Sequence, residues 1–315
     1  MRLAPTSSRN PEAVPSERRA GSLYAIAAFG FWGLTPIYYK LLPHVPPIEV
    51  LAHRIVWSVV FGAVFVSLVS AWPAVRTALS SPPTVRALAL TAALVSTNWL
   101  VYIYAIVNDQ VMSTSLGYYI NPLVNVLLGM VFLHERLGRG RTLAVALAAM
   151  GTASLAFELG GLPWISLTLA FSFGFYGLIR KRLGLPAMAA LFIETLLMAP
   201  LALLALAWFG LQGASSFGAD TRTTLLLVLA GPVTLLPLLW FAEAARRLPL
   251  VTVGFFQYLG PTLTFLLATL VYGEAFTAAW VVTFALIWSG LAVFTIDNLR
   301  TRRQLRRHAR DDWPS

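Results

Sequence analysis

The chain has 315 residues, of which 58% are hydrophobic and only 11% are charged. A soluble protein of this size with so few charges could not cover its surface, which indicates that lipid is the main solvent of this chain. The sequence contains no cysteine, so disulfides, thiolate metal sites and cysteine nucleophiles are excluded.

Ten apolar windows follow one another along the chain, each near the roughly 20 residues that a helix needs to cross a bilayer. Single apolar strands would leave backbone groups unpaired in lipid, so the windows are expected to be helices. They cover residues 21–41, 49–70, 84–106, 112–133, 142–158, 163–180, 188–209, 223–242, 250–272 and 278–297. The sequence therefore predicts an all-α integral membrane protein with ten transmembrane helices.

Two polar segments flank these windows. Residues 1–20 contain three prolines and no apolar run, which predicts a disordered cytoplasmic tail. Residues 299–315 are basic, and we expect this second cytoplasmic tail to lie at the anionic inner leaflet. The first window is too long for the core of a signal peptide and lacks a clear cleavage site, so it is interpreted as the first span.

The basic residues gather in alternate connections. Of the 23 Lys and Arg residues, 20 lie in the two tails or in the connections after the second, fourth, sixth and eighth windows. The positive-inside rule then places both termini and these connections in the cytoplasm. A nucleic-acid binder would instead gather its basic residues on one folded face, so the net charge of +10 does not indicate nucleic acid as a partner.

Two stretches of the chain repeat each other. The motif YINP ends at Pro122 and precedes Glu135 by thirteen residues, and YLGP ends at Pro261 and precedes Glu274 by the same distance. A half of five helices crosses the membrane an odd number of times, so the second half must be inverted relative to the first. This arrangement is the one that alternating access requires. The two inverted five-helix repeats are predicted over residues 21–158 and 162–298.

The two prolines are expected to kink their helices, because each removes an N–H donor and clashes with the preceding turn. Kinked backbone at membrane depth is tolerated only where it is buried in protein or lines a wet cavity. A single proline in a membrane helix is ordinary. Two prolines at equivalent positions, Pro122 and Pro261, are less ordinary, and they favour the interpretation that both kinks line one wet pathway.

Two ionisable residues lie inside predicted spans, where each costs at least a few kcal/mol and indicates a functional site. Arg54 is placed to bind a substrate carboxylate, and Glu194 to bind an amine or a coupling proton. The alternative is structural: each side chain snorkels, or the two pair to hold the bundle. The neighbouring His53 points about 100° away from Arg54 around the helix and is interpreted as a packing or interfacial residue.

Further polar and aromatic residues within the windows either join neighbouring helices or line a cavity for an apolar or aromatic metabolite. With the two ionisable residues, the candidate cavity set is Trp32, Arg54, Asn98, Trp99, Tyr119, Asn121, Glu194, Gln257 and Tyr258. Three charged residues at helix ends are interpreted as gate or helix-end contacts, namely Lys40, Glu135 and Glu274. Snorkelling is the simpler interpretation of Lys40.

Several motifs together resemble the RarD family, a branch of the EamA group in the drug/metabolite transporter superfamily. They are HR and WS around Arg54, NW at Asn98, SLGYYINPL ending at Leu123, LAFSF with FYGL in the sixth window, and GFFQY with GPT around Pro261. The resemblance covers about residues 20–298. It implies ten helices, cytoplasmic termini, a central cavity, a bacterial inner membrane, and export of small metabolites or drugs, amino-acid-like or aromatic.

The favoured function is thus a secondary transporter that binds its substrate near the midplane, driven by protons through Glu194 or acting by facilitated diffusion. Its expected partners are a small-molecule substrate, the lipid bilayer and protons as a candidate coupling ion. An integral-membrane enzyme is disfavoured by the absence of HExxH and nucleophile-elbow motifs, and the absence of a P-loop excludes ATP-driven pumping by this chain. No cofactor or metal is expected. A non-transporting receptor or scaffold is the other alternative, although it would not need two inverted halves.

Overall fold

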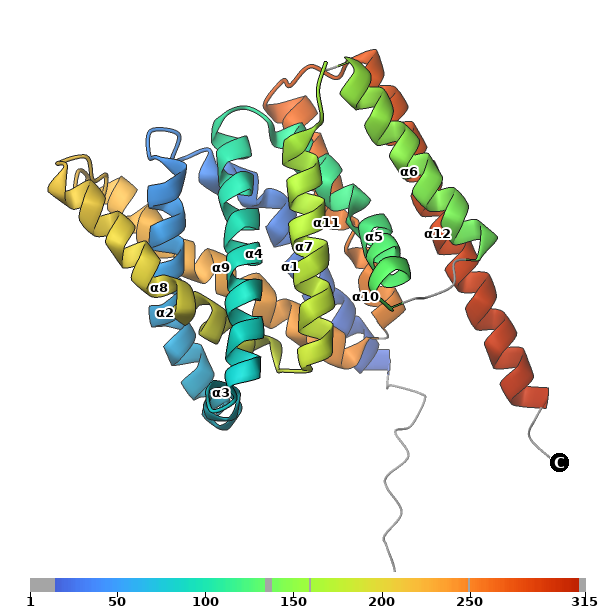
Figure 1. The fold of residues 1–315 in the computed structure, drawn as a ribbon, viewed down its shortest axis with the longest axis horizontal. Helices are drawn as coiled ribbons and strands as arrows, with labels where there is room; N and C mark the ends of the chain where they lie inside the picture. The colour runs from blue at the N-terminus through green and yellow to red at the C-terminus, as the bar shows by residue number, and fades with distance from the viewer. Residues whose placement is uncertain (1–14, 134–137, 159, 249, 312–315) are drawn as a thin grey trace, which may run out of the picture.

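The computed structural model describes residues 15–133, 138–158, 160–248 and 250–311, and every regular element among them is a helix (Figure 1). The elements are α1 (Pro15–Tyr39), α2 (Pro47–Leu68), α3 (Trp72–Leu79), α4 (Pro82–Val107), α5 (Val111–Leu133), α6 (Arg139–Glu158), α7 (Trp164–Leu183), α8 (Ala187–Leu211), α9 (Thr221–Arg247), α10 (Leu250–Phe256), α11 (Leu259–Leu266), the π-helical η1 (Leu267–Val271) and α12 (Ala278–Asp311).

Eight of the described helical segments are long and apolar enough to cross a membrane. The apolar part of α6, Thr142–Glu158, is shorter, and the last turn of α7 carries Arg180, Lys181 and Arg182. The fold is therefore that of an all-helical membrane protein. A helix occupies each of the ten predicted windows, with α10, α11 and η1 together covering the ninth.

The helix ends differ from the prediction at three places. Helix α1 begins at Pro15, inside the tail predicted over residues 1–20, because proline suits the first turn and Glu17 follows it there. Helix α12 continues to Asp311, so most of the segment predicted as the second tail is helical. The short α3 was not predicted, since eight amphipathic residues lie below the length of a span.

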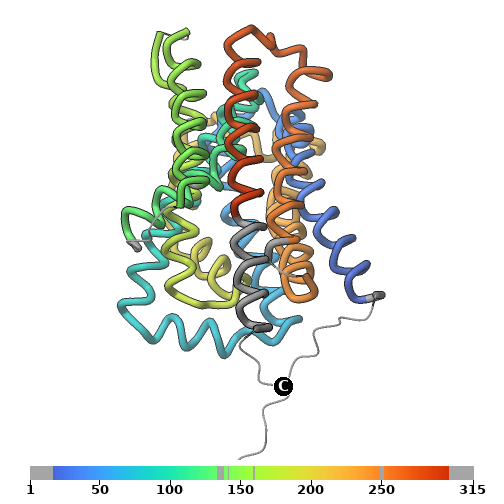
Figure 2. Tube along the Cα trace, turned by 90° about the vertical axis from the view of Figure 1, so that its right-hand side faces the viewer, coloured from blue at the N-terminus to red at the C-terminus, as the bar shows by residue number. Residues whose placement is uncertain are grey.

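The helices pack in a pattern that joins distant parts of the chain. Helix α1 contacts α9 and α11, whereas α7 contacts α4 and α5. Helix α2 lies against α8 and α9, and α6 lies beside α12 at one edge of the bundle (Figure 1). In the perpendicular view the orange α11 runs next to the blue α1 (Figure 2). Helix α1 begins and α12 ends at the same face of the bundle, which we call the terminal face.

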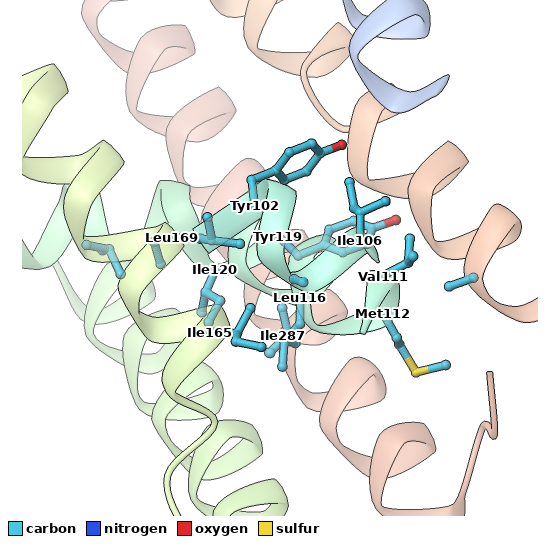
Figure 3. Packing of buried hydrophobic residues seen from close by; sticks show 14 of the residues in the cluster. Tyr102, Ile106, Val111, Met112, Leu116, Tyr119, Ile120, Ile165, Leu169 and Ile287 are labelled. Carbon is cyan, nitrogen blue, oxygen red and sulfur yellow. The ribbon is translucent and has the colours of Figure 1, made fainter. Parts of the chain in front are cut away.

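Small residues permit these close approaches, as is usual where van der Waals packing holds membrane helices together. A Cβ on Gly33 of α1 would lie 2.7 Å from the carbonyl oxygen of Gly260 in α11. A Cβ on Gly231 of α9 would lie 2.7 Å from the backbone of Trp57 in α2. The largest apolar core surrounds α5 and includes Leu116 and Ile120 (Figure 3).

The two prolines of the repeated motif have different surroundings. Pro122 lies inside α5, which continues through it as one helix. Pro261 lies in the first turn of α11, directly after the interruption at Gln257 and Tyr258 that separates α10 from α11. The helix of the second motif is thus interrupted at Gln257 and Tyr258, and it continues without a gap from α11 into the π-helical η1, which ends it.

Candidate functional site

Arg54 lies on the buried side of α2 and is only 9% exposed. Its Nη1 donates a hydrogen bond to the hydroxyl of Tyr39 at 2.8 Å. The guanidinium lies over the ring of Trp99, 3.9 Å from the ring centroid, in cation–π contact. Its Nε is buried without a hydrogen-bond partner. One face and one end of the guanidinium are thus held by protein, while the Nε edge is not.

Tyrosines extend this centre in a chain of edge and tilted ring contacts. The ring of Tyr39 lies 5.9 Å from that of Tyr102, which in turn lies 5.9 Å from Tyr118. Tyr102 shares a 2.8 Å hydrogen bond with Thr35, and Tyr118 donates to Oδ1 of Asn98 at 3.1 Å. We call Arg54, Trp99, Tyr39, Tyr102 and Tyr118 the Arg54 centre. Its residues come from α1, α2, α4 and α5, so only the folded bundle assembles it.

The two buried asparagines of the candidate set fix neighbouring helices. Asn98 of α4 donates from Nδ2 to the carbonyl of Leu169 and to the hydroxyl of Ser172, each at 3.0 Å. Asn121 of α5 donates to the carbonyl of Ala170 at 3.4 Å and accepts from Asn125 at 2.9 Å. These hydrogen bonds join α4 and α5 to α7. Both amides therefore join neighbouring helices, which is one of the two roles that the sequence suggested for them.

Glu194 lies in a separate polar centre between α4, α7 and α8. Its Oε1 accepts a hydrogen bond from Thr91 at 2.7 Å and lies 3.6 Å from Nε of Arg180. Its Oε2 accepts from the hydroxyl of Tyr176 at 3.2 Å. The partner of Glu194 is therefore Arg180, a residue that the charge pattern assigned to a cytoplasmic connection, rather than Arg54.

Glu274 belongs to the connection between η1 and α12, which lies at the face of the bundle opposite the terminal face (Figure 1). Its oxygens accept hydrogen bonds from the backbone N–H groups of Val111 and Met112 at 2.6 and 2.8 Å, at the start of α5. Burial raises the pKa of the Glu274 carboxyl, and the two backbone hydrogen bonds partly oppose this shift. Nearby, Lys40 pairs with Asp109 and lies over the ring of Tyr272.

The remaining sequence candidates lie in other packing environments. Trp32 packs against Phe29 and Phe241, with ring centroids 5.5 and 6.1 Å away. Tyr119 shares a 2.6 Å hydrogen bond with Thr262 of α11. Gln257 and Tyr258 are half-buried at the interruption between α10 and α11. Glu135 lies outside the described residues.

The sequence interpretation missed Glu49, which is fully buried at the start of α2. Its carboxylate accepts hydrogen bonds from the N–H and hydroxyl of Ser216 at 2.7 and 2.8 Å, and from the hydroxyl of Ser215 at 3.2 Å. It therefore anchors the α8–α9 connection to α2. In the same connection Phe217 stacks on the buried His53, with ring centroids 4.8 Å apart. The signal for Glu49 was an acidic residue in a proline-initiated first turn.

Buried polar atoms without a hydrogen-bond partner concentrate on α2. In the described part of the chain they occur in six residues, and four of these belong to α2, namely His53, Arg54, Trp57 and Ser58. Such atoms are costly unless a ligand or solvent satisfies them, so α2 is the described helix whose buried polar atoms most need such a partner. The residues that the structure describes contain no group of three or more acidic or histidine side chains that could hold a metal ion.

Comparisons with known proteins agree with this architecture. The EamA-like transporter family matches residues 19–157. An uncharacterized transporter of Vibrio cholerae is 48% identical over 292 residues, which cover 92% of this chain and 97% of that protein. Protein RarD of Escherichia coli is 45% identical over 289 residues, covering 91% of this chain and 98% of that protein. A solved crystal structure, 22% identical, shares the fold with a TM-score of 0.56 over 89% of this chain and 98% of that chain.

Proposed function

Because the chain belongs to the RarD family of EamA-like transporters, we propose that it is a secondary transporter with ten membrane spans, built as two inverted five-helix repeats. It moves small organic metabolites across the bacterial inner membrane by alternating access. Both termini lie in the cytoplasm, as the alternation of basic connections indicates.

The observation that carries this proposal is a reciprocal contact between α6 and α12. A Cβ on Gly151 would lie 3.1 Å from the carbonyl oxygen of Thr283, and a Cβ on Gly290 would lie 2.8 Å from that of Ala144. Gly290 follows Gly151 by 139 positions, and Thr283 follows Ala144 by the same number. Pro261 follows Pro122 by this number too. Equivalent residues touching each other reciprocally are expected of a pseudo-two-fold axis between repeats.

The two buried ionisable centres obey a similar relation. Helix α2 starts after Pro46 with ψ of 135°, and α8 starts after Pro186 with ψ of 134°. Arg54 and Glu194 each follow their proline by eight residues, so each lies about 12 Å along its helix. In an inverted repeat these helices enter from opposite faces. The two centres then lie on either side of the midplane, where a transport pathway needs polar groups.

Contacts between the proposed halves suit a gate at the face opposite the terminal face. Glu274 belongs to the second half and caps α5 of the first, while Lys40 of the first half lies over the ring of Tyr272 in the second. We propose that these contacts close the pathway at this face and separate when it opens. Trp32, Tyr119, Gln257 and Tyr258 remain proposed pathway residues, and the break at Gln257 and Tyr258 is the proposed hinge.

The test is exchange of labelled compounds by the purified protein in proteoliposomes, against protein-free vesicles. The panel holds anionic, zwitterionic, cationic and neutral aromatic compounds of similar size. Saturable exchange of at least one compound supports the transporter. A compound that binds the purified protein but does not exchange would instead support a receptor, and would overturn the proposal.

A further inference from the structure

Arg54 is a buried cation without a carboxylate partner in the described part of the chain. Arg54 takes part in none of the ion pairs between described residues, which include Lys40–Asp109, Arg180–Glu194, Arg246–Glu243 and the pairs of Arg247 with Glu17 and Glu243. The nearest acidic residue along α2, Glu49, is about 7.5 Å away in helix rise and is held by Ser215 and Ser216. An arginine stays charged in a protein, so the centre keeps a positive charge to be matched.

The free edge of this guanidinium has the geometry of a carboxylate receptor. Nη1 is used by Tyr39 and the flat face by Trp99, whereas Nε is buried and unpartnered. Nη2 makes no hydrogen bond to any described residue either. The Nε–Nη2 edge presents two parallel N–H groups, which is how arginine binds planar anions in bidentate fashion. Trp99 and the tyrosines provide an aromatic surface beside it.

Glu194 offers nothing comparable to a cation. Both of its oxygens already accept hydrogen bonds, and Arg180 lies within ion-pair distance of it. An amine would therefore have to displace Arg180 or share a carboxylate that is already neutralised. The two buried centres together carry one unmatched charge, and that charge is positive.

We infer that the Arg54 centre binds the anionic group of a small aromatic or apolar monoanion, and that the protein prefers such monoanions over amines and over zwitterionic amino acids. The anionic group is a carboxylate, a sulfonate or another oxyanion that presents two oxygens to the Nε–Nη2 edge. This inference rests on the proposed function, because it takes the Arg54 centre to lie on the transport pathway.

Three probes that share one aromatic ring test the inference: benzenesulfonate as the monoanion, phenylalanine as the zwitterion and benzyltrimethylammonium as the cation. Benzenesulfonate stays charged and does not leak through the bilayer as a neutral acid. Binding is measured as the shift of the thermal unfolding midpoint of the full-length protein in lipid nanodiscs. Benzenesulfonate is expected to raise the midpoint, and the other two probes are expected to have little effect at equal concentration.

Arg54→Gln is expected to raise the half-saturating concentration of benzenesulfonate at least about ten-fold, since a charge-assisted hydrogen bond is lost. Arg54→Lys should recover part of the affinity, because lysine keeps the positive charge but lacks the two parallel N–H donors of the guanidinium. Arg222→Gln is the matched control. It removes one positive charge from the exposed first turn of α9 and should leave binding unchanged. If Arg54→Gln does not fold, the inference is tested by Arg54→Lys, which should bind benzenesulfonate more weakly than both the wild type and Arg222→Gln.

The inference is overturned if benzenesulfonate fails to stabilise the wild type, if the cation stabilises it as well, or if Arg54→Gln and Arg54→Lys bind like the control. These outcomes are separable from failure of the proposed function. Exchange of cations or zwitterions but not of monoanions would overturn the anion inference and would still support the transporter proposal. Arg54-dependent binding of benzenesulfonate without exchange of any compound would overturn the transporter proposal and leave the anion inference intact.

Discussion

Glu274 caps the helix that begins at Val111, although 163 positions separate the two residues in the chain. The carboxylate accepts hydrogen bonds from the first two N–H groups of α5, where the positive end of the helix dipole also favours an anion. A contact that spans the two proposed halves thus fixes the start of the helix that carries Pro122. In the proposed mechanism, this contact would have to separate when the pathway opens at this face.

Replacing Glu274 should therefore destabilise the protein and change its response to pH. Glu274→Ala removes both acceptors and is expected to cost about 1 kcal/mol of stability, as for loss of a helix cap. Because burial raises the pKa of this carboxyl above its ordinary 4.5, the folded protein binds the proton more tightly than the unfolded chain. Its contribution to stability is then present below about pH 4.5 and is lost as the pH rises through the raised pKa.

The measurement is thermal unfolding of wild type and Glu274→Gln between pH 4 and pH 8, at about half-unit steps. Glutamine does not titrate, so the difference between the wild-type and variant midpoints should fall as the pH rises and then level off. A difference that stays constant over this range would contradict the assignment of the raised pKa to Glu274.

The number of spans can be tested at the α6–α7 connection, because the native chain contains no cysteine. Gly161 is exposed there, and a Cβ on it would meet no other atom within 4 Å. If α6 and α7 both cross the membrane, Gly161→Cys is labelled by an impermeant maleimide from outside intact cells. Ser80→Cys, in the exposed connection after α3, is the cytoplasmic control and should react only after permeabilisation. Labelling of both cysteines from the same side would rule out the ten-span topology.

The reciprocal contact of α6 with α12 predicts unequal costs for two equivalent glycines. Gly290→Ala places a Cβ 2.8 Å from the carbonyl oxygen of Ala144, whereas Gly151→Ala places one 3.1 Å from that of Thr283. We expect Gly290→Ala to lower stability by roughly 1–3 kcal/mol, as overpacking does, and Gly151→Ala by less.

Gly210 of α8 provides the control for this pair, since a Cβ on it would meet nothing within 4 Å. Gly210→Ala should leave stability unchanged or raise it by up to about 1 kcal/mol, the difference in helix propensity. Equal unfolding midpoints for Gly290→Ala and Gly210→Ala would show that α6 and α12 do not approach as closely as described.

The ion pair of Glu194 with Arg180 predicts non-additive effects of substitution. Each single change, Glu194→Gln or Arg180→Gln, leaves a largely buried charge without its partner and should be clearly destabilising. The double variant should be more stable than the sum of the two losses allows, by roughly 0.5–3 kcal/mol. A double-mutant cycle of unfolding midpoints measures this coupling, and strictly additive losses would mean that the two residues do not interact.

Hydropathy and charge determined the helical elements of this protein. The ten windows each hold a helix, because apolar backbone in lipid has to satisfy its own hydrogen bonds and a helix does so locally. The windows could not reveal α3, which is too short, or the break at Gln257 and Tyr258, where hydropathy stays high. The same patterns indicated Arg54 and Glu194, since an ionisable residue within a span is visible without any partner.

The chain alone could not supply the partners of these residues. Glu194 pairs with Arg180 across fourteen positions, Glu49 holds a serine 167 positions away, and Glu274 caps a helix 163 positions before it. Local periodicity carries no information about such contacts, because they depend on which helices lie side by side and at what depth. Composition and the distribution of basic residues along the chain were enough to predict a helical membrane protein with alternating basic connections. The tertiary packing alone decided that Glu194 is neutralised while the Nε edge of Arg54 is left without a partner.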